Sequence, residues 1–239
     1  MRLLVVAEQL RRPVPGGIGT YVRGLVTGLR GLGPEVTLWA SRRPRGGPDP
    51  LAELGSVVTS PLPARALVAA WDRGLARPPG SPDVLHATSF AVPPPGGVRL
   101  SVMVHDLAWR HFPDAYPRRG RRWHEAALGR ALQRAGLLVV PSSTVADDLL
   151  AAGAPAAKVE VVEEGCDHLA DPDDAGARAV LDRLGVTGQF LLTVSTLEPR
   201  KNLPRLLAAY DAVRTKLPPL VVVGPAGWGP EVRPGPGVV

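Results

Sequence analysis

Short apolar runs alternate with helical patterns along most of the chain. The runs are four or five residues long, as expected for parallel strands that are buried on both faces of a sheet. They predict strands at 3–7, 36–40, 84–87, 100–104, 137–140 and 158–162. Between them, apolar residues recur at spacings of three and four, the period of an amphipathic helix. This pattern predicts helices over 18–32, 65–75, 119–135 and 142–150, whereas the Pro-, Gly- and Arg-rich residues 41–62 predict a loop.

The order of these elements indicates the fold class. Strand–helix–strand repeats with short turns imply parallel strands and right-handed crossovers, hence a doubly wound, Rossmann-like α/β domain. We expect this N-terminal domain over 1–166, a polar linker over 167–174 and a second α/β unit over 175–239.

The second unit has fewer predicted elements than the first. Helices are expected at 175–184 and 203–214, and strands at 190–194 and 220–223. Two strands do not make a complete domain. We therefore expect the chain to hold only the beginning of a second domain, with the apolar residues 221–223 exposed on an unpaired strand.

Composition narrows the function classes. The chain has 28 Lys and Arg against 22 Asp and Glu, but the basic residues are dispersed and aromatics make up only 5%. This composition argues against a nucleic-acid partner. There is no apolar stretch of transmembrane length and no signal-peptide pattern, and the single Cys166 cannot form an internal disulfide. We expect a cytoplasmic protein; the basic run 118–122 is either solvated surface or a peripheral contact with the anionic inner face of the membrane.

A glycine-rich segment, Gly16–Tyr21, lies between the first strand and its helix. Glycines there allow close approach of a ligand, and free N–H groups at a helix N-terminus favour an anion. The segment departs from the dinucleotide fingerprint, because Tyr21 and Val22 follow where the third glycine should fall. A purely structural tight turn is the alternative.

His105 and Asp106 follow an apolar strand. Ligands of open α/β sheets bind beyond the carboxyl ends of the strands, and an imidazole can exchange protons or hydrogen-bond a sugar hydroxyl. The alternative is a structural histidine. His86, near the end of another strand, raises the same question.

Arg200 and Lys201 precede a predicted helix in the segment Ser195–Asn202. Cations are unfavourable at a helix N-terminus, so this pair indicates either an anionic ligand or solvated surface charge. The Asp171-Pro172-Asp173 segment fits a helix N-cap better than a metal site. No other spacing is typical of metal ligands, so we expect no metal.

Taken together, these segments resemble glycosyltransferase family 4. The resemblance rests on Gly16–Tyr21, Val104–Leu107, Val139–Ser143, Leu191–Asn202, Leu206–Tyr210 and Leu220–Trp228. It implies a GT-B fold of two Rossmann-like domains and a retaining transfer of a mannosyl or glucosyl type of hexose. The donor would be a nucleotide sugar, and the acceptor a glycan or a lipid-linked sugar, as in polysaccharide biosynthesis. No cofactor is implied.

The resemblance also implies roles for individual residues. His105 would be catalytic and contact the donor sugar, and Arg200 and Lys201 would neutralise the leaving diphosphate. Gly17 and Gly19 would lie near the donor phosphates. The acceptor side would be formed by Thr20, Tyr21 and Asp106.

The chain departs from the family pattern in three places. Thr196 stands where an arginine is common, and Glu163-Glu164-Gly165 replaces a usual Pro-Asn-Gly. The family's two donor-binding glutamates, eight positions apart, are expected beyond residue 239. Two alternatives therefore stay open: a nucleotide-sugar epimerase of the same fold, and a non-catalytic remnant or partner subunit.

Overall fold

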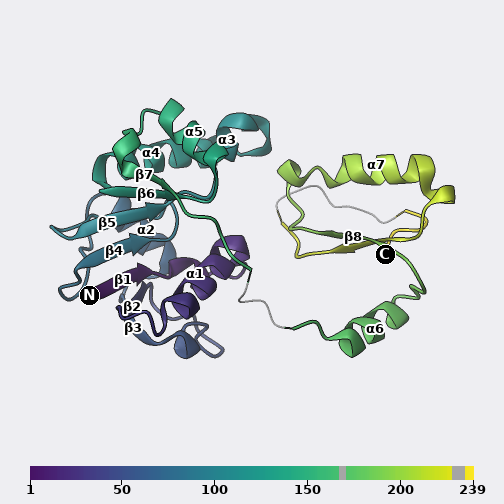
Figure 1. Cartoon of the computed structure of the whole chain (residues 1–239), viewed down its shortest axis with the longest axis horizontal. Helices are drawn as coiled ribbons and strands as arrows, with labels where there is room; N and C mark the ends of the chain where they lie inside the picture. The colour runs from purple at the N-terminus through teal and green to yellow at the C-terminus, as the bar shows by residue number, and fades with distance from the viewer. Residues whose placement is uncertain (167–170, 228–234) are drawn as a thin grey trace. The chain divides into compact units, whose positions relative to one another are not determined.

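The computed structural model describes residues 1–166, 171–227 and 235–239 (Figure 1). The chain forms two compact units, Met1–His168 and Leu169–Val239.

Unit 1 is built on a parallel sheet, as the sequence predicts. Its described part has seven strands in the order β3-β2-β1-β4-β5-β6-β7. The strands are Arg2–Val6 (β1), Glu35–Ala40 (β2), Ser56–Thr59 (β3), Val84–Ala87 (β4), Arg99–Met103 (β5), Leu137–Val140 (β6) and Val159–Val161 (β7). The helices are Gly16–Leu29 (α1), Ala64–Asp72 (α2), Ala108–His111 (α3), Arg118–Arg134 (α4) and Ser143–Ala151 (α5). Short 3-10 helices occupy Glu8–Arg11 (η1), Ala52–Leu54 (η2), Pro113–Ala115 (η3) and Ala156–Lys158 (η4).

The sheet of unit 1 carries a hydrophobic core on each face. Alternate residues of β1 point to opposite faces, so Leu3 and Val5 pack beneath α1 while Leu4 and Val6 join the core beneath α2, α4 and α5. Burial on both faces explains the continuous apolar runs of the central strands, and the doubly wound α/β class is confirmed.

Besides the short 3-10 helices, a strand and a helix of unit 1 were not expected. The strand β3 lies within the predicted loop 41–62 and pairs only with β2 at the edge of the sheet. Its side chains are largely exposed, so it lacks the apolar run that marks a buried strand. The one-turn helix α3 begins where the Asp106 carboxylate accepts the backbone N–H of Ala108 at 3.0 Å, a local cap rather than a periodic pattern.

Unit 2 contains two helices and a small parallel sheet in its described residues. They are Asp174–Arg183 (α6), Leu191–Val194 (β8), Leu203–Val213 (α7) and Leu220–Val223 (β9), with 3-10 helices at Pro199–Lys201 (η5) and Arg214–Lys216 (η6). Asp173 caps α6 as expected, because its carboxylate accepts the N–H of Gly176 at 2.9 Å.

The expectation that 221–223 would form an uncovered strand is wrong. The chain returns at residues 237–239 and pairs beside β9, where the N–H of Val222 donates to the Val239 carbonyl at 2.8 Å. Val221 is buried, and Val223 is the exposed residue of the three. Most exposed apolar side chains of the sheet lie instead on β8, at Leu191, Leu192 and Val194.

Candidate functional site

Four polar side chains from separate segments of unit 1 meet where strands β4, β5 and β7 end. Tyr21 comes from the second turn of α1, His86 from β4, His105 from just beyond β5, and Glu164 from beyond β7. We call these four residues the histidine cluster. It lies at the carboxyl ends of parallel strands, the position at which open α/β sheets bind ligands.

His86 forms the buried half of the cluster. The residue is only 7% exposed. Its Nε2 lies 3.0 Å from the Tyr21 hydroxyl, and its Nδ1 lies 2.8 Å from the Ser101 hydroxyl. Burial and the charge of His105 lower the pKa of His86 to about 4. The ring is therefore neutral near pH 7, with one nitrogen donating and the other accepting.

Tyr21 links the two histidines. Besides its contact with His86, its ring meets the His105 ring edge-on, with centroids 5.1 Å apart and an interplanar angle of 84°. Burial and the negative charge of Glu164 raise the pKa of Tyr21 to about 12, so the phenol stays protonated. The glycine-rich start of α1 is thereby held beside the end of β5.

His105 forms the accessible half of the cluster. Its side chain is 21% exposed, and Nδ1 lies 2.8 Å from the Glu164 carboxylate. Nε2 lies 3.0 Å from the backbone carbonyl of Thr88. Both ring nitrogens thus face oxygen acceptors in this structure, and the ring orientation is fixed by β4 and by the segment after β7.

The predicted glycines differ in their surroundings. Gly17 is exposed, and a Cβ at this position would meet no atom within 4 Å. Gly19 is buried, and a Cβ there would overlap Pro15 and lie 3.2 Å from the Leu10 side chain. Packing thus requires a glycine at position 19, whereas Gly17 leaves the N-terminus of α1 open to a ligand; the donor-side role of both glycines stays a prediction.

The remaining predicted residues of unit 1 lie nearby in the chain. Thr20 is exposed on α1, where it is accessible to an acceptor. Asp106 is partly buried, and one of its carboxylate oxygens is used to cap α3. The roles of Thr20, Tyr21 and Asp106 in acceptor binding stay predictions.

In unit 2, the predicted cations Arg200 and Lys201 belong to η5. The Arg200 guanidinium lies 3.4 Å from the Glu198 carboxylate, whereas Lys201 is exposed. The loops after β8 and β9 approach backbone to backbone, since a Cβ at Gly224 or Gly227 would overlap main-chain atoms of Ser195 or Leu197. This packing fixes the segment that leads into η5.

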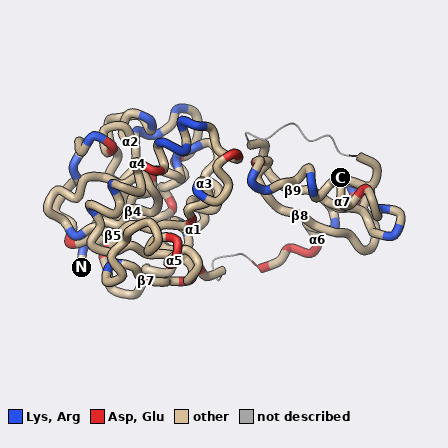
Figure 2. Tube along the Cα trace, turned by 90° about the horizontal axis from the view of Figure 1, so that it is seen from above, with Lys and Arg blue, Asp and Glu red and all other residues tan. Residues whose placement is uncertain are grey.

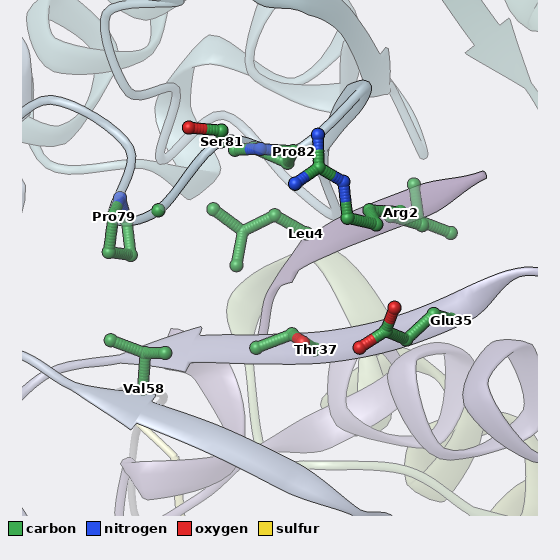
Figure 3. Close-up of a pocket in the computed structure, with 10 residues that line it drawn as sticks. Arg2, Leu4, Glu35, Thr37, Val58, Pro79, Ser81 and Pro82 are labelled. Atoms are coloured by element: carbon green, nitrogen blue, oxygen red, sulfur yellow. The ribbon is translucent and has the colours of Figure 1, made fainter.

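A pocket of about 180 Å³ opens at the opposite end of the sheet in unit 1. Arg2, Glu35 and Thr37 line it from β1 and β2, and Pro79 and Ser81 cover it (Figure 3). It contains none of the predicted site residues.

Among the described residues, no group of three His, Cys, Asp or Glu side chains is arranged to hold a metal ion. In the same part of the chain, no helix is both long and apolar enough to cross a membrane.

Comparison with known proteins finds the same family that the sequence motifs suggest. The model of Glycosyltransferase Family 4 matches residues 15–168. The O-antigen chain mannosyltransferase B of Escherichia coli is 28% identical over 140 residues, which cover 56% of this chain and 37% of that protein.

Solved structures of glycosyltransferases share the fold. Anabaena HepE in complex with UDP-glucose superposes with a TM-score of 0.66 at 18% identity, over 96% of this chain and 62% of that chain. The catalytic domain of starch synthase IV from Arabidopsis thaliana, bound to ADP and acarbose, gives a TM-score of 0.53 at 13% identity over 94% and 68%. The present chain thus spans just over one third of the mannosyltransferase and less than two thirds of HepE.

Sequence reasoning missed three features of the cluster: Glu164 as a partner of His105, the Thr88 carbonyl, and the contact between Tyr21 and His86. The departure Glu163-Glu164-Gly165 was the available signal for Glu164. No pattern in the sequence indicates the carbonyl of Thr88.

Proposed function

Because the chain belongs to glycosyltransferase family 4, we propose that it acts in the transfer of a hexosyl group from a nucleotide sugar. The proposed hexose is of mannosyl or glucosyl type, and transfer proceeds with retention to a glycan or lipid-linked acceptor. The observation that carries the proposal is the ring contact of Tyr21 with His105. This contact brings together the two motifs of unit 1 for which a ligand role was predicted.

The proposed chemistry follows from the charges that develop during transfer. Departure of a nucleoside diphosphate places negative charge on its oxygens, which fixed cations and backbone N–H groups stabilise. Lys201, assisted by Arg200, would neutralise the diphosphate, and the N–H groups near Gly17 would face donor oxygens. His105 would donate a hydrogen bond to the donor sugar. A front-face mechanism needs no carboxylate nucleophile, and in this proposal no metal ion takes part.

A glycan acceptor is supported by the relative from Escherichia coli, whose name identifies it as an O-antigen chain mannosyltransferase. The exposed Thr20 and the partly exposed Tyr21 of α1 would meet the acceptor. Tyr21 belongs to the histidine cluster, and Thr20 precedes it in the chain.

The test is nucleotide binding by the chain and by matched lysine variants. Saturation-transfer NMR with UDP, UDP-glucose and GDP-mannose detects binding in the millimolar range. Lys201→Ala should weaken binding of the diphosphate, by roughly tenfold for the loss of one charged hydrogen bond. Lys216→Ala, at an exposed lysine of the same unit, should leave it unchanged. Equal binding by the two variants would contradict the donor role of Lys201.

We further propose peripheral contact of unit 1 with anionic lipid at the cytoplasmic membrane face. Arg118, Arg119 and Arg122 are exposed at the start of α4, and Phe112 nearby in the chain is 59% exposed. Figure 2 shows basic residues in blue near α2 and α4. An aromatic side chain together with several cations favours an anionic interface, at about 1 kcal/mol per basic residue.

Sedimentation with vesicles tests this contact. The chain should co-sediment with phosphatidylglycerol vesicles and remain in solution with phosphatidylcholine vesicles. Replacement of the three arginines by serine should abolish co-sedimentation. Binding that is independent of lipid charge, or that survives the replacement, would refute the contact.

A further inference from the structure

The Glu164 carboxylate and the Thr88 carbonyl hold the two nitrogens of the His105 ring. The oxygens lie 2.8 Å from Nδ1 and 3.0 Å from Nε2. A neutral imidazole has one N–H and therefore satisfies only one of two acceptors, whereas the doubly protonated ring satisfies both.

The other groups around His105 do not compete for this role. Tyr21, from α1, and His86, from β4, are both uncharged near pH 7, since the pKa of Tyr21 is raised to about 12 and that of His86 is lowered to about 4. Asp106 adjoins His105 in the chain and caps α3. Glu163 precedes Glu164 in the chain and supplies a matched carboxylate for comparison. Glu164 is therefore the carboxylate that contacts the His105 ring.

We propose that Glu164 is a positioning residue that fixes the orientation of the His105 ring, so that Nδ1 faces the carboxylate and Nε2 faces the Thr88 carbonyl. Glu164 lies 59 residues away in the sequence, beyond β7, and reaches the ring from the segment that leaves unit 1. The end of that segment is thereby attached to the end of β5.

This arrangement defines what His105 can do in the proposed transferase, on which this part of the inference rests. With Nε2 held at the Thr88 carbonyl, Nδ1 is the nitrogen that can meet a sugar hydroxyl or a phosphate oxygen. The Thr88 carbonyl belongs to a buried residue, whereas the Glu164 side chain is 43% exposed. An incoming ligand oxygen would thus replace Glu164 at Nδ1 and leave the bond to Thr88 intact.

NMR of the full chain labelled with ¹⁵N-histidine tests the proposal without a donor. In acidic solution, near pH 5.5, the His105 Nδ1 proton should give a strongly downfield signal that exchanges slowly with water, as expected for a charge-assisted bond. In Glu164→Ala this signal should be lost, or its exchange with water should accelerate about three- to tenfold, the range expected for a partly exposed charged hydrogen bond. Glu163→Ala should retain the signal unchanged.

The isosteric variant Glu164→Gln separates charge from shape. Its amide oxygen still accepts a hydrogen bond but carries no charge, so the signal should persist and move upfield. The absence of a downfield signal in the unaltered chain, or an identical signal in Glu164→Ala, would overturn the proposal. Failure of nucleotide binding would instead contradict the proposed function and leave this signal as it is.

Discussion

Acidification should destabilise unit 1 through His86. The ring is 7% exposed and lies between the hydroxyls of Tyr21 and Ser101. A neutral ring serves both hydroxyls, whereas a protonated ring would place a charge in the core. Burial, together with the nearby charge of His105, lowers the pKa of His86 from 6.5 to about 4.

The magnitude follows from proton linkage. Between pH 6.5 and about 4, the unfolded chain binds a proton at His86 and the folded chain does not, so stability falls as the pH falls. Each pH unit in this window corresponds to 1.36 kcal/mol, which gives a loss of about 3 kcal/mol across it. The contribution is complete above pH 6.5, and no further loss from this group occurs below its folded pKa.

Urea unfolding followed by tryptophan fluorescence measures this loss. Four of the five tryptophans, at positions 39, 71, 109 and 123, lie in unit 1, so the signal mainly reports that unit. The free energy of unfolding should fall between pH 6.5 and 4 with a smaller slope in His86→Gln than in the unaltered chain. Thr20→Ala, at an exposed position of α1 without a titratable side chain, serves as the control and should keep the original slope. Parallel slopes for the unaltered chain and His86→Gln would refute the reasoning.

The other predictions concern the start of α1, metal dependence and affinity. Gly19→Ala should destabilise unit 1 by about 1–3 kcal/mol, because its methyl group would overlap Pro15. Gly17→Ala, where a Cβ meets no atom within 4 Å, should stabilise α1 by about 0.5–1 kcal/mol. Equal urea midpoints for the two variants would contradict this difference. EDTA should leave the Tm unchanged, and a marked decrease would indicate a bound metal. Residues 1–239 contain no two glutamates eight positions apart, so nucleotide sugars should bind to this chain in the millimolar range. Micromolar binding by calorimetry would contradict this expectation.

Most of the fold could be predicted because it follows from burial. The strand β1 is apolar at each position from Leu3 to Val6, and the alternate residues serve opposite cores. The strand β3 could not be predicted, because an edge strand with exposed side chains has no such pattern. In unit 2, the pairing of 237–239 with β9 also escaped prediction, since a three-residue segment carries too little periodicity.

The site could be predicted only in part. The rule that ligands lie beyond the carboxyl ends of parallel strands singles out His105 and the start of α1, and Tyr21 does join them. The rule says nothing about which side chains from distant segments reach the same ring. The contact of Glu164 with His105 depends on the path of the chain after β7, which local spacing does not encode.

The two histidines show how the fold assigns different chemistry to similar sequence contexts. Both lie at or near the ends of neighbouring strands and follow apolar residues, so the sequence presents them as equivalent. His86 is enclosed by hydroxyls, which can donate or accept, and this environment favours the neutral ring. His105 faces a carboxylate and a carbonyl, which favour the ring with two N–H groups. Burial, and after it the charge on His105, lowers the pKa of His86. The fold thus separates a buried neutral ring from a partly exposed ring that Glu164 and Thr88 position for a ligand.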